Sequence, residues 1–238
     1  MQDPNVIVKR LRDKYQHIIK EIELAIPGYE PEVEWSISIL ERLEARLCTY
    51  KFGFVFLKDG SLSMRTLFID FAQYLQDTIG YYGDIEQPLE YSDVFRPEYL
   101  HVLKKVFFTL ALRLEVAFRF LQVYNREVCK PLGFQIKYCH YRGDCESLFL
   151  AEIHNARDLS SEALATRIEA FIDFCIKLTE EIDKELAREE VRPIITRERE
   201  EVDRRVREGE WLRVDESFLK SLGLDVRPRV NEEALIVS

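Results

Sequence analysis

Apolar residues recur every three or four positions over much of this chain, the spacing that predicts amphipathic helices. The longest such pattern covers residues 97–128, where two apolar stripes leave only a narrow polar seam. A helix that is apolar on most sides needs other elements to cover it, so we expect this one to be the centre of the fold. Shorter helical patterns cover residues 4–26, 31–50, 65–79, 161–191, 196–208 and 215–222.

Two stretches follow the alternation of strands instead. Residues 52–57 are rich in strand-favouring side chains, and Asp59-Gly60 then separates them from residues 61–64, which predicts a hairpin over 52–64. Apolar and polar residues also alternate on both sides of a turn within 134–153, which predicts a second hairpin. The sequence therefore predicts a helix-dominated α+β fold in which two hairpins pack near the central helix and can join into one sheet. An all-α bundle is the alternative.

The composition changes after residue 191. Residues 1–191 read as one helical core domain with two hairpins, whereas 192–238 read as a charged C-terminal extension with few apolar residues. An extension of this kind packs on its own domain, on a sister subunit or on another protein. We expect residues 193–238 to hold a second copy of the chain or a protein partner.

The totals exclude several classes of protein. The 238 residues are 47% hydrophobic, which is ample for a core, and their net charge of −9 argues against nucleic-acid binding. Arg113, Glu115 and Arg119 interrupt the apolar run of the central helix, so we expect no membrane span. Five scattered Cys and a charged N-terminus without a signal peptide indicate reduced thiols in a cytoplasmic protein.

The second hairpin carries the most informative motif. Its sequence, FQIKYCHYRGDCESLFL (134–150), resembles the Cys-rich hairpin of the 4-vinyl-reductase, or hydrocarbon-binding, domain family. The family pattern is Cys, three residues, Gly-Asp, two residues, Cys, one residue and Phe. The chain matches it at Cys139, Gly143, Asp144 and Phe149, but Cys145 comes two residues early and Ser147 stands in its place. The order of helices and hairpins is also similar to that of vesicle-tethering (TRAPP) subunits. The resemblance implies a pocket for a small apolar or lipid-like molecule and a regulatory or assembly role.

The residues themselves suggest where such a molecule would bind. Phe134, Tyr138 and Phe149 are expected near the central helix, where they would wall an apolar pocket. Glu115 and Arg119 stand four positions apart in the polar seam and form either a functional polar patch or a structural ion pair.

A zinc site is a further hypothesis for this hairpin. Cys139 and Cys145 are expected to face each other across it, and Glu146, His154 or Cys129 would complete a set of ligands. The other interpretation is two ordinary thiols beside a turn made by Gly143-Asp144.

Arg followed by His after four residues occurs twice, at Arg12/His17 and Arg96/His101, and resembles the catalytic motif of HEPN ribonucleases. Structural histidines are the alternative, and we assign no catalytic residue. The leading hypothesis is a non-enzymatic binding or regulatory protein for a small apolar or lipid-like molecule. A structural or assembly subunit that uses the C-terminal extension is the second hypothesis, and an RNA-cleaving enzyme is the third.

Overall fold

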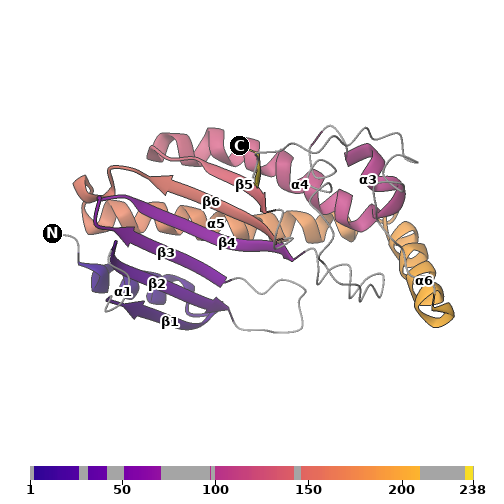
Figure 1. The fold of residues 1–238 in the computed structure, drawn as a ribbon, viewed down its shortest axis with the longest axis horizontal. Helices are drawn as coiled ribbons and strands as arrows, with labels where there is room; N and C mark the ends of the chain where they lie inside the picture. Colours follow the sequence, from indigo (N-terminus) through magenta and orange to yellow (C-terminus); the bar gives the residue numbers. More distant parts are fainter. Residues whose placement is uncertain are drawn as a thin grey trace.

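A computed structural model of the chain describes residues 3–26, 32–41, 51–70, 97, 100–141, 146–209 and 234–237. Seven strands form one antiparallel sheet in the order β1-β2-β3-β4-β6-β5-β7 (Figure 1). The strands are β1 (Ile19–Ala25), β2 (Val33–Glu41), β3 (Lys51–Leu57), β4 (Leu62–Asp70), β5 (Ile136–Tyr141), β6 (Glu146–Ile153) and β7 (Ala234–Val237). The described helices are α1 (Pro4–Tyr15), α3 (Leu100–Val106), α4 (Phe108–Tyr124), α5 (Ser161–Leu186) and α6 (Arg192–Glu208), with short turns η3 (Asn125–Cys129), η4 (Lys130–Leu132) and η5 (Ala156–Asp158).

This sheet shows that the predicted fold class is wrong. The protein is α+β, but neither a helix-dominated fold with only two hairpins nor an all-α bundle describes it. Residues 19–25 and 33–41, which the helical spacing assigned to helices, are β1 and β2. The first hairpin is present, but β4 extends to Asp70, so residues 65–70 are strand rather than the start of a helix. The rest of that predicted helix, and the one over 215–222, lie outside the described residues.

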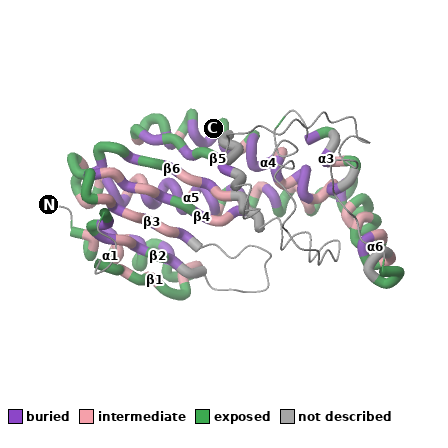
Figure 2. The backbone as a smooth tube through the Cα atoms, in the orientation of Figure 1, coloured by how far each residue is buried: buried purple, intermediate pink, exposed green. Residues whose placement is uncertain are grey.

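One face of the sheet packs on helices. Buried residues alternate with less buried ones along the strands, as Figure 2 shows for β3 and β4. Phe54 of β3 lies 6.2 Å from Phe171 of α5, measured between ring centroids. Phe149 of β6 lies 4.9 Å from Phe174 of the same helix. The hydrophobic core therefore lies between the sheet and the layer of α1, α4 and α5.

The opposite face is seen in Figure 1, where the strands lie in front of α5. No described helix crosses the strands on this side, which we call the open face. Antiparallel sheets commonly pack one face on the hydrophobic core and leave the other face in contact with solvent. The described helices therefore leave this face uncovered, although Cys139, which lies on it opposite Leu148, is only 1% exposed.

The predicted central helix is divided rather than continuous. It is interrupted at Phe107, between α3 and α4, and the π-helical turn η3 follows α4. Backbone hydrogen bonds from Phe107 to Leu103 (2.7 Å) and from Ala111 to Phe107 (2.9 Å) continue across the break. Most of the circumference of α4 is enclosed, since its buried residues include Leu110, Ala111, Leu112, Leu114, Val116, Ala117, Phe118 and Leu121.

The described parts of the C-terminal extension contact the body of the same chain. α6 extends away from the sheet in Figure 1, but its Glu198 carboxylate accepts a hydrogen bond from the backbone N–H of Thr109, at 3.1 Å, in the first turn of α4. β7 pairs with β5 and becomes an edge of the sheet. Both contacts tie residues after 191 to the core within one molecule.

Candidate functional site on the open face of the sheet

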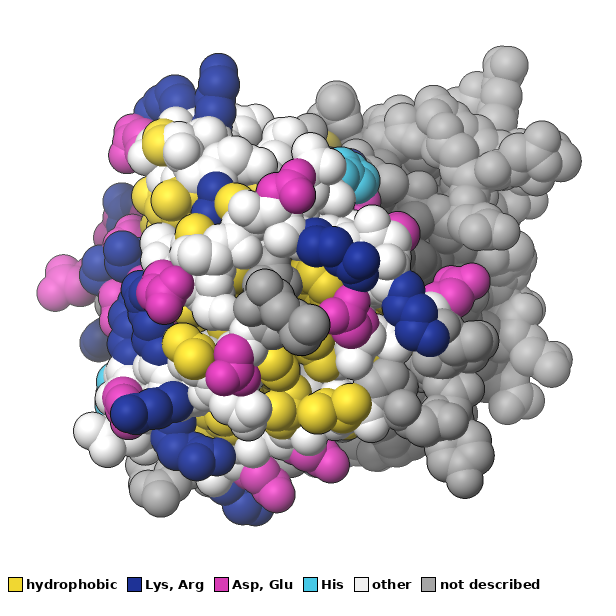
Figure 3. Space-filling view, turned by 90° about the vertical axis from the view of Figure 1, so that its left-hand side faces the viewer, with side chains coloured by type: hydrophobic (Ala, Val, Ile, Leu, Met, Phe, Trp, Pro, Cys, Tyr) yellow, Lys and Arg dark blue, Asp and Glu magenta, His cyan; other side chains and the backbone are white. Residues whose placement is uncertain are grey.

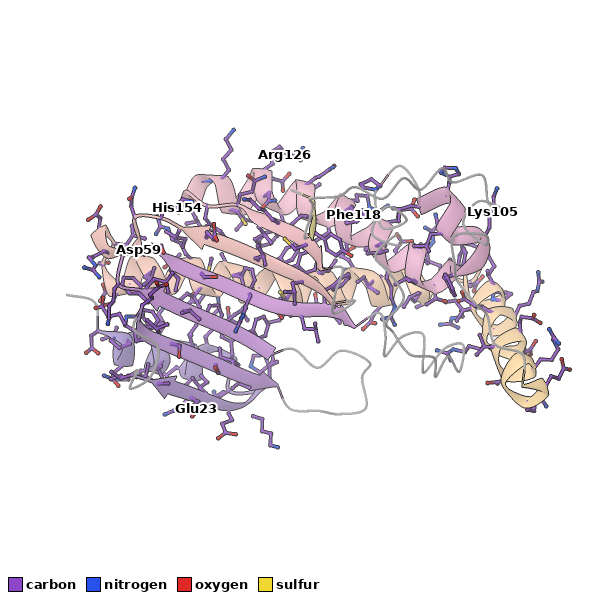
Figure 4. All side chains as sticks on the ribbon, viewed as in Figure 1. Glu23, Asp59, Lys105, Phe118, Arg126 and His154 are labelled. Atoms are coloured by element: carbon purple, nitrogen blue, oxygen red, sulfur yellow. The ribbon has the colours of Figure 1, made fainter. Side chains whose placement is uncertain are left out.

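The three predicted pocket aromatics are buried on the helix side of the sheet. Tyr138 and Phe149 are in contact, with ring centroids 5.8 Å apart. Phe118 of α4, labelled in Figure 4, lies 5.1 Å from Tyr138. Phe134 is also buried, just before β5 begins. The structure thus brings Tyr138 and Phe149 together within a close-packed aromatic cluster.

Glu115 and Arg119 have separate partners. Glu115 forms an ion pair with Lys104 of α3. Arg119 donates to the Glu185 carboxylate of α5 at 3.2 Å, although 63% of its side chain is exposed. Arg188 and Arg119 hold the pKa of Glu185 below its ordinary value. The polar seam of α4 therefore links that helix to α3 and α5.

Cys139 is 1% exposed, opposite Leu148 of β6 and Ile236 of β7. Burial raises the pKa of its thiol, which disfavours the thiolate that zinc requires. His154, labelled in Figure 4 at one end of β6, follows Leu148 by six residues, so it lies about 20 Å away along the strand. Cys145 is outside the described residues, and among those described no group of three or more His, Cys, Asp or Glu is placed to hold a metal ion.

The Arg/His pairs are only partly described. Arg12 is exposed on α1, and His17 is exposed beyond Tyr15, where that helix ends. Arg12 and His17 are therefore not both held on one helix. His101 is exposed on α3, and Arg96 lies outside the described residues.

A groove between α1 and α5 carries several charges. It is lined by Val6, Lys9, Arg10, Asp13, Lys14 and Glu169. Glu169 is 8% exposed and accepts hydrogen bonds from Arg10 Nη2 at 3.0 Å and Lys14 Nζ at 3.3 Å. Its buried charge is thus paired, and basic and acidic side chains are interspersed over this end of the molecule in Figure 3. The groove is a structural joint between two helices.

The open face carries a different arrangement. Register places one residue from each of six strands in a continuous row across it: Glu23, Ser38, Gly53, Arg65, Leu150 and Lys137. The residues before and after Gly53 and Arg65, among them Phe54 and Met64, are buried on the helix side. Strand alternation therefore directs the row itself to the open face.

Leucines occupy one part of this face. Leu67 of β4 pairs with Leu148 of β6, and Leu150 follows two residues later, on the same face. Residues directly opposite in neighbouring strands have Cβ atoms about 5 Å apart, so the three side chains form one apolar patch. All three are of intermediate exposure. We call Leu67, Leu148 and Leu150 the leucine patch.

Arg65 borders the leucine patch and lies against β3. A Cβ atom added at Gly53 would meet Arg65 Nε at 3.3 Å and its Cγ at 3.4 Å. The absence of a side chain at Gly53 therefore allows the arginine to lie across the neighbouring strand. Arg65 is exposed, and within the described part of the chain it has no hydrogen-bond or ion-pair partner.

Sequence reasoning missed Arg65 because it placed that residue at the start of a helix. Two signals identify it. Leu62, Met64, Thr66 and Phe68 continue the strand alternation beyond the turn. The turn at Asp59-Gly60 also fixes the hairpin register, which sets Arg65 opposite Gly53.

Comparison of the chain with protein-family models, curated proteins and solved structures found no match. None of the described helices has the length and apolar character to cross a membrane. The functional argument therefore rests on the geometry of the open face.

Proposed function

We propose that this protein is a non-enzymatic binding protein for a small lipid-like molecule, which it holds on the open face of its sheet. The observation that carries this proposal is the leucine patch. Along the strands of an antiparallel sheet with one solvated face, polar residues that point to the solvent normally alternate with apolar residues that point to the core. Here three leucines on adjoining strands are grouped on the side that no described helix covers.

The patch suits a ligand better than it suits the solvent. Burial of apolar surface stabilises a complex by roughly 25 cal/mol per Å², so an alkyl chain that covers the three leucines gains binding energy from each. The net charge of −9 disfavours nucleic acid as the ligand.

The resemblance of residues 134–150 to the hydrocarbon-binding domain family implies the same class of ligand, although no family model matches the chain. The site that we propose, however, differs from the aromatic pocket expected from the sequence. Tyr138 already contacts both Phe118 and Phe149 in the core, whereas the leucine patch is on the reverse side of the same hairpin. The open face is therefore the site we propose.

The test is isothermal titration of the purified protein with dodecanol below its solubility limit. Leu148→Thr and Leu150→Thr keep a strand-favouring side chain but remove apolar contact, so we expect each variant to bind dodecanol more weakly. Leu57→Thr is the matched control, because Leu57 is of intermediate exposure and lies at the far end of β3. Absence of dodecanol binding, or equal losses in all three variants, would overturn the proposal.

A further inference from the structure

The geometry points to a narrower class of ligand: a single-chain amphiphile whose head group is a carboxylate, recognised by Arg65. This inference rests on the proposed function and adds the chemistry of the head group. It starts from the position of Arg65, which stands at the boundary between two parts of the open face. Leu150 is opposite it on β6, and Gly53 is opposite it on β3.

The β3 side of this boundary has room for a head group. Gly53 has no side chain, and its neighbour in the row on β2 is Ser38, an exposed residue with a short hydroxyl side chain. The stem of Arg65 lies over Gly53, so its guanidinium is directed over this small-residue region. A carboxylate here would accept two parallel N–H donors from the guanidinium.

The β6 side of the boundary accommodates the chain of the amphiphile. From Arg65 the open face continues directly onto Leu150, and Leu67 and Leu148 lie one row further along the strands. An alkyl chain whose carboxylate is paired with Arg65 would therefore lie on the leucine patch. Polar and apolar ends of the ligand thus match adjoining parts of one surface.

The other charges on this face favour a single negative charge. Lys137 is in the same row as Arg65, two strands away, or about 10 Å. Glu152 is exposed in the adjoining row, opposite Ser63. A carboxylate beside Arg65 gains attraction from both cations, whereas Glu152, and Glu23 next to Ser38 in the same row, oppose additional negative charge. A monocarboxylate is therefore the best match.

Titration with dodecanoate and with dodecanol, both below their aggregation limits, separates the head group from the chain. We expect the wild-type protein to bind dodecanoate roughly tenfold or more tightly than dodecanol, the factor for one charge-assisted hydrogen bond. Arg65→Gln should abolish this preference and leave dodecanol binding unchanged. Gly53→Val should reduce the preference while the charge is retained, because its side chain displaces Arg65 from β3.

Arg12→Gln is the matched control, since it makes the same change in net charge at an exposed position on α1. It should leave the preference for dodecanoate intact. Equal affinity for dodecanoate and dodecanol, or an equal loss in Arg12→Gln and Arg65→Gln, overturns the inference about the head group but leaves the lipid-binding function standing. Failure of both compounds to bind overturns the proposed function as well. Circular dichroism of each variant at the titration temperature verifies that it is folded.

Discussion

The side chain of Asn125 pairs with both backbone polar groups of Ile136. Its Nδ2 donates to the Ile136 carbonyl at 2.7 Å, and its Oδ1 accepts from the Ile136 N–H at 2.8 Å. Asn125 begins the π-helical turn after α4, and Ile136 begins β5. One buried amide therefore joins the end of the central helix to the hairpin that carries part of the leucine patch.

Replacement of Asn125 by Ala should destabilise the fold. It leaves a donor and an acceptor of Ile136 unpaired in the core, at about 1–3 kcal/mol for each buried group that loses its partner. Urea unfolding measures the change. Gln122→Ala, at an exposed position on α4, should alter stability by no more than about 0.5 kcal/mol. Equal stability of the two variants would mean that the hydrogen bonds between Asn125 and Ile136 have no structural role.

Truncations on α4 test its place in the core. Leu110 and Leu114 are both fully buried, so Leu110→Ala or Leu114→Ala should lower the free energy of unfolding by about 2–5 kcal/mol. Val123→Ala is the control, since Val123 is 38% exposed near the end of the same helix. Chemical denaturation that gives losses below about 1 kcal/mol for both leucine variants would place α4 outside the core.

The sequence could predict the elements whose boundaries have local signals. The Ser160 hydroxyl accepts from the N–H of Ala163 as the N-cap of α5, which begins at residue 161, where the helical pattern predicted its start. Asp59-Gly60 does turn the chain between β3 and β4. In both cases a few neighbouring residues determine the local structure.

The first two strands were missed because their residues fit two periods at once. Ile18, Ile22 and Ile26 are four positions apart, which indicated a helix, yet Ile22 and Leu24 alternate along β1. Residues 33–39 repeat an apolar side chain at every second position, a strand signal that the helical interpretation passed over. Pairing between β1 and β2 then decides the structure, and no single segment contains that information. The open face could not be predicted from the sequence for the same reason, because it forms only when the strands pair.

Two constraints act on Gly60 at the first hairpin turn: its backbone conformation and the space around its Cα atom. Two variants separate them. Gly60 has φ = +91°, and an added Cβ would lie 3.1 Å from the Cβ of Arg157. Gly133 has φ = +78°, but an added Cβ would meet only Arg167 Nη2, at 4.0 Å. Gly133→Ala should therefore show the backbone penalty alone, about 1 kcal/mol, and Gly60→Ala should cost more. Thermal unfolding of both variants makes the comparison, and a Gly60→Ala variant as stable as Gly133→Ala would exclude a steric contribution from Arg157.

The contact between α6 and α4 predicts how the extension is held. The Glu198 carboxylate accepts from the backbone N–H of Thr109, near the positive end of the α4 dipole. Glu198→Ala removes this acceptor and should lower stability by about 0.5–2 kcal/mol, the range for loss of a helix cap. It should also speed proteolytic cleavage between α5 and α6. Glu200→Ala, at an exposed position of α6, is the control, and equal cleavage rates in the two variants would show that the cap does not hold the helix.

The buried thiol of Cys129 predicts a loss of stability in alkaline solution. Its side chain is fully buried, and burial raises the pKa of the thiol from 9.0 to about 12. Between these two values the unfolded chain releases the proton while the folded chain retains it. The contribution of the protonated thiol to the free energy of unfolding is therefore fully present below about pH 9. It is lost as the pH rises further, by about 1.4 kcal/mol per pH unit. Tyr15 and Tyr124 add to this loss above about pH 10, because burial raises the pKa of each.

Urea unfolding from pH 7 to pH 10.5 isolates the contribution of Cys129. Cys129→Ala should be less stable than the wild type at pH 7, because it leaves a small cavity, but its stability should fall less steeply above pH 9. Val128→Ala truncates the neighbouring residue without removal of a titratable group, so it should retain the wild-type slope. Near pH 10, the slope of the unfolding free energy against pH should differ between the wild type and Cys129→Ala by the equivalent of about one bound proton. Parallel pH profiles for these two proteins would mean that the thiol ionises equally in the folded and unfolded states, and that burial does not hold it neutral.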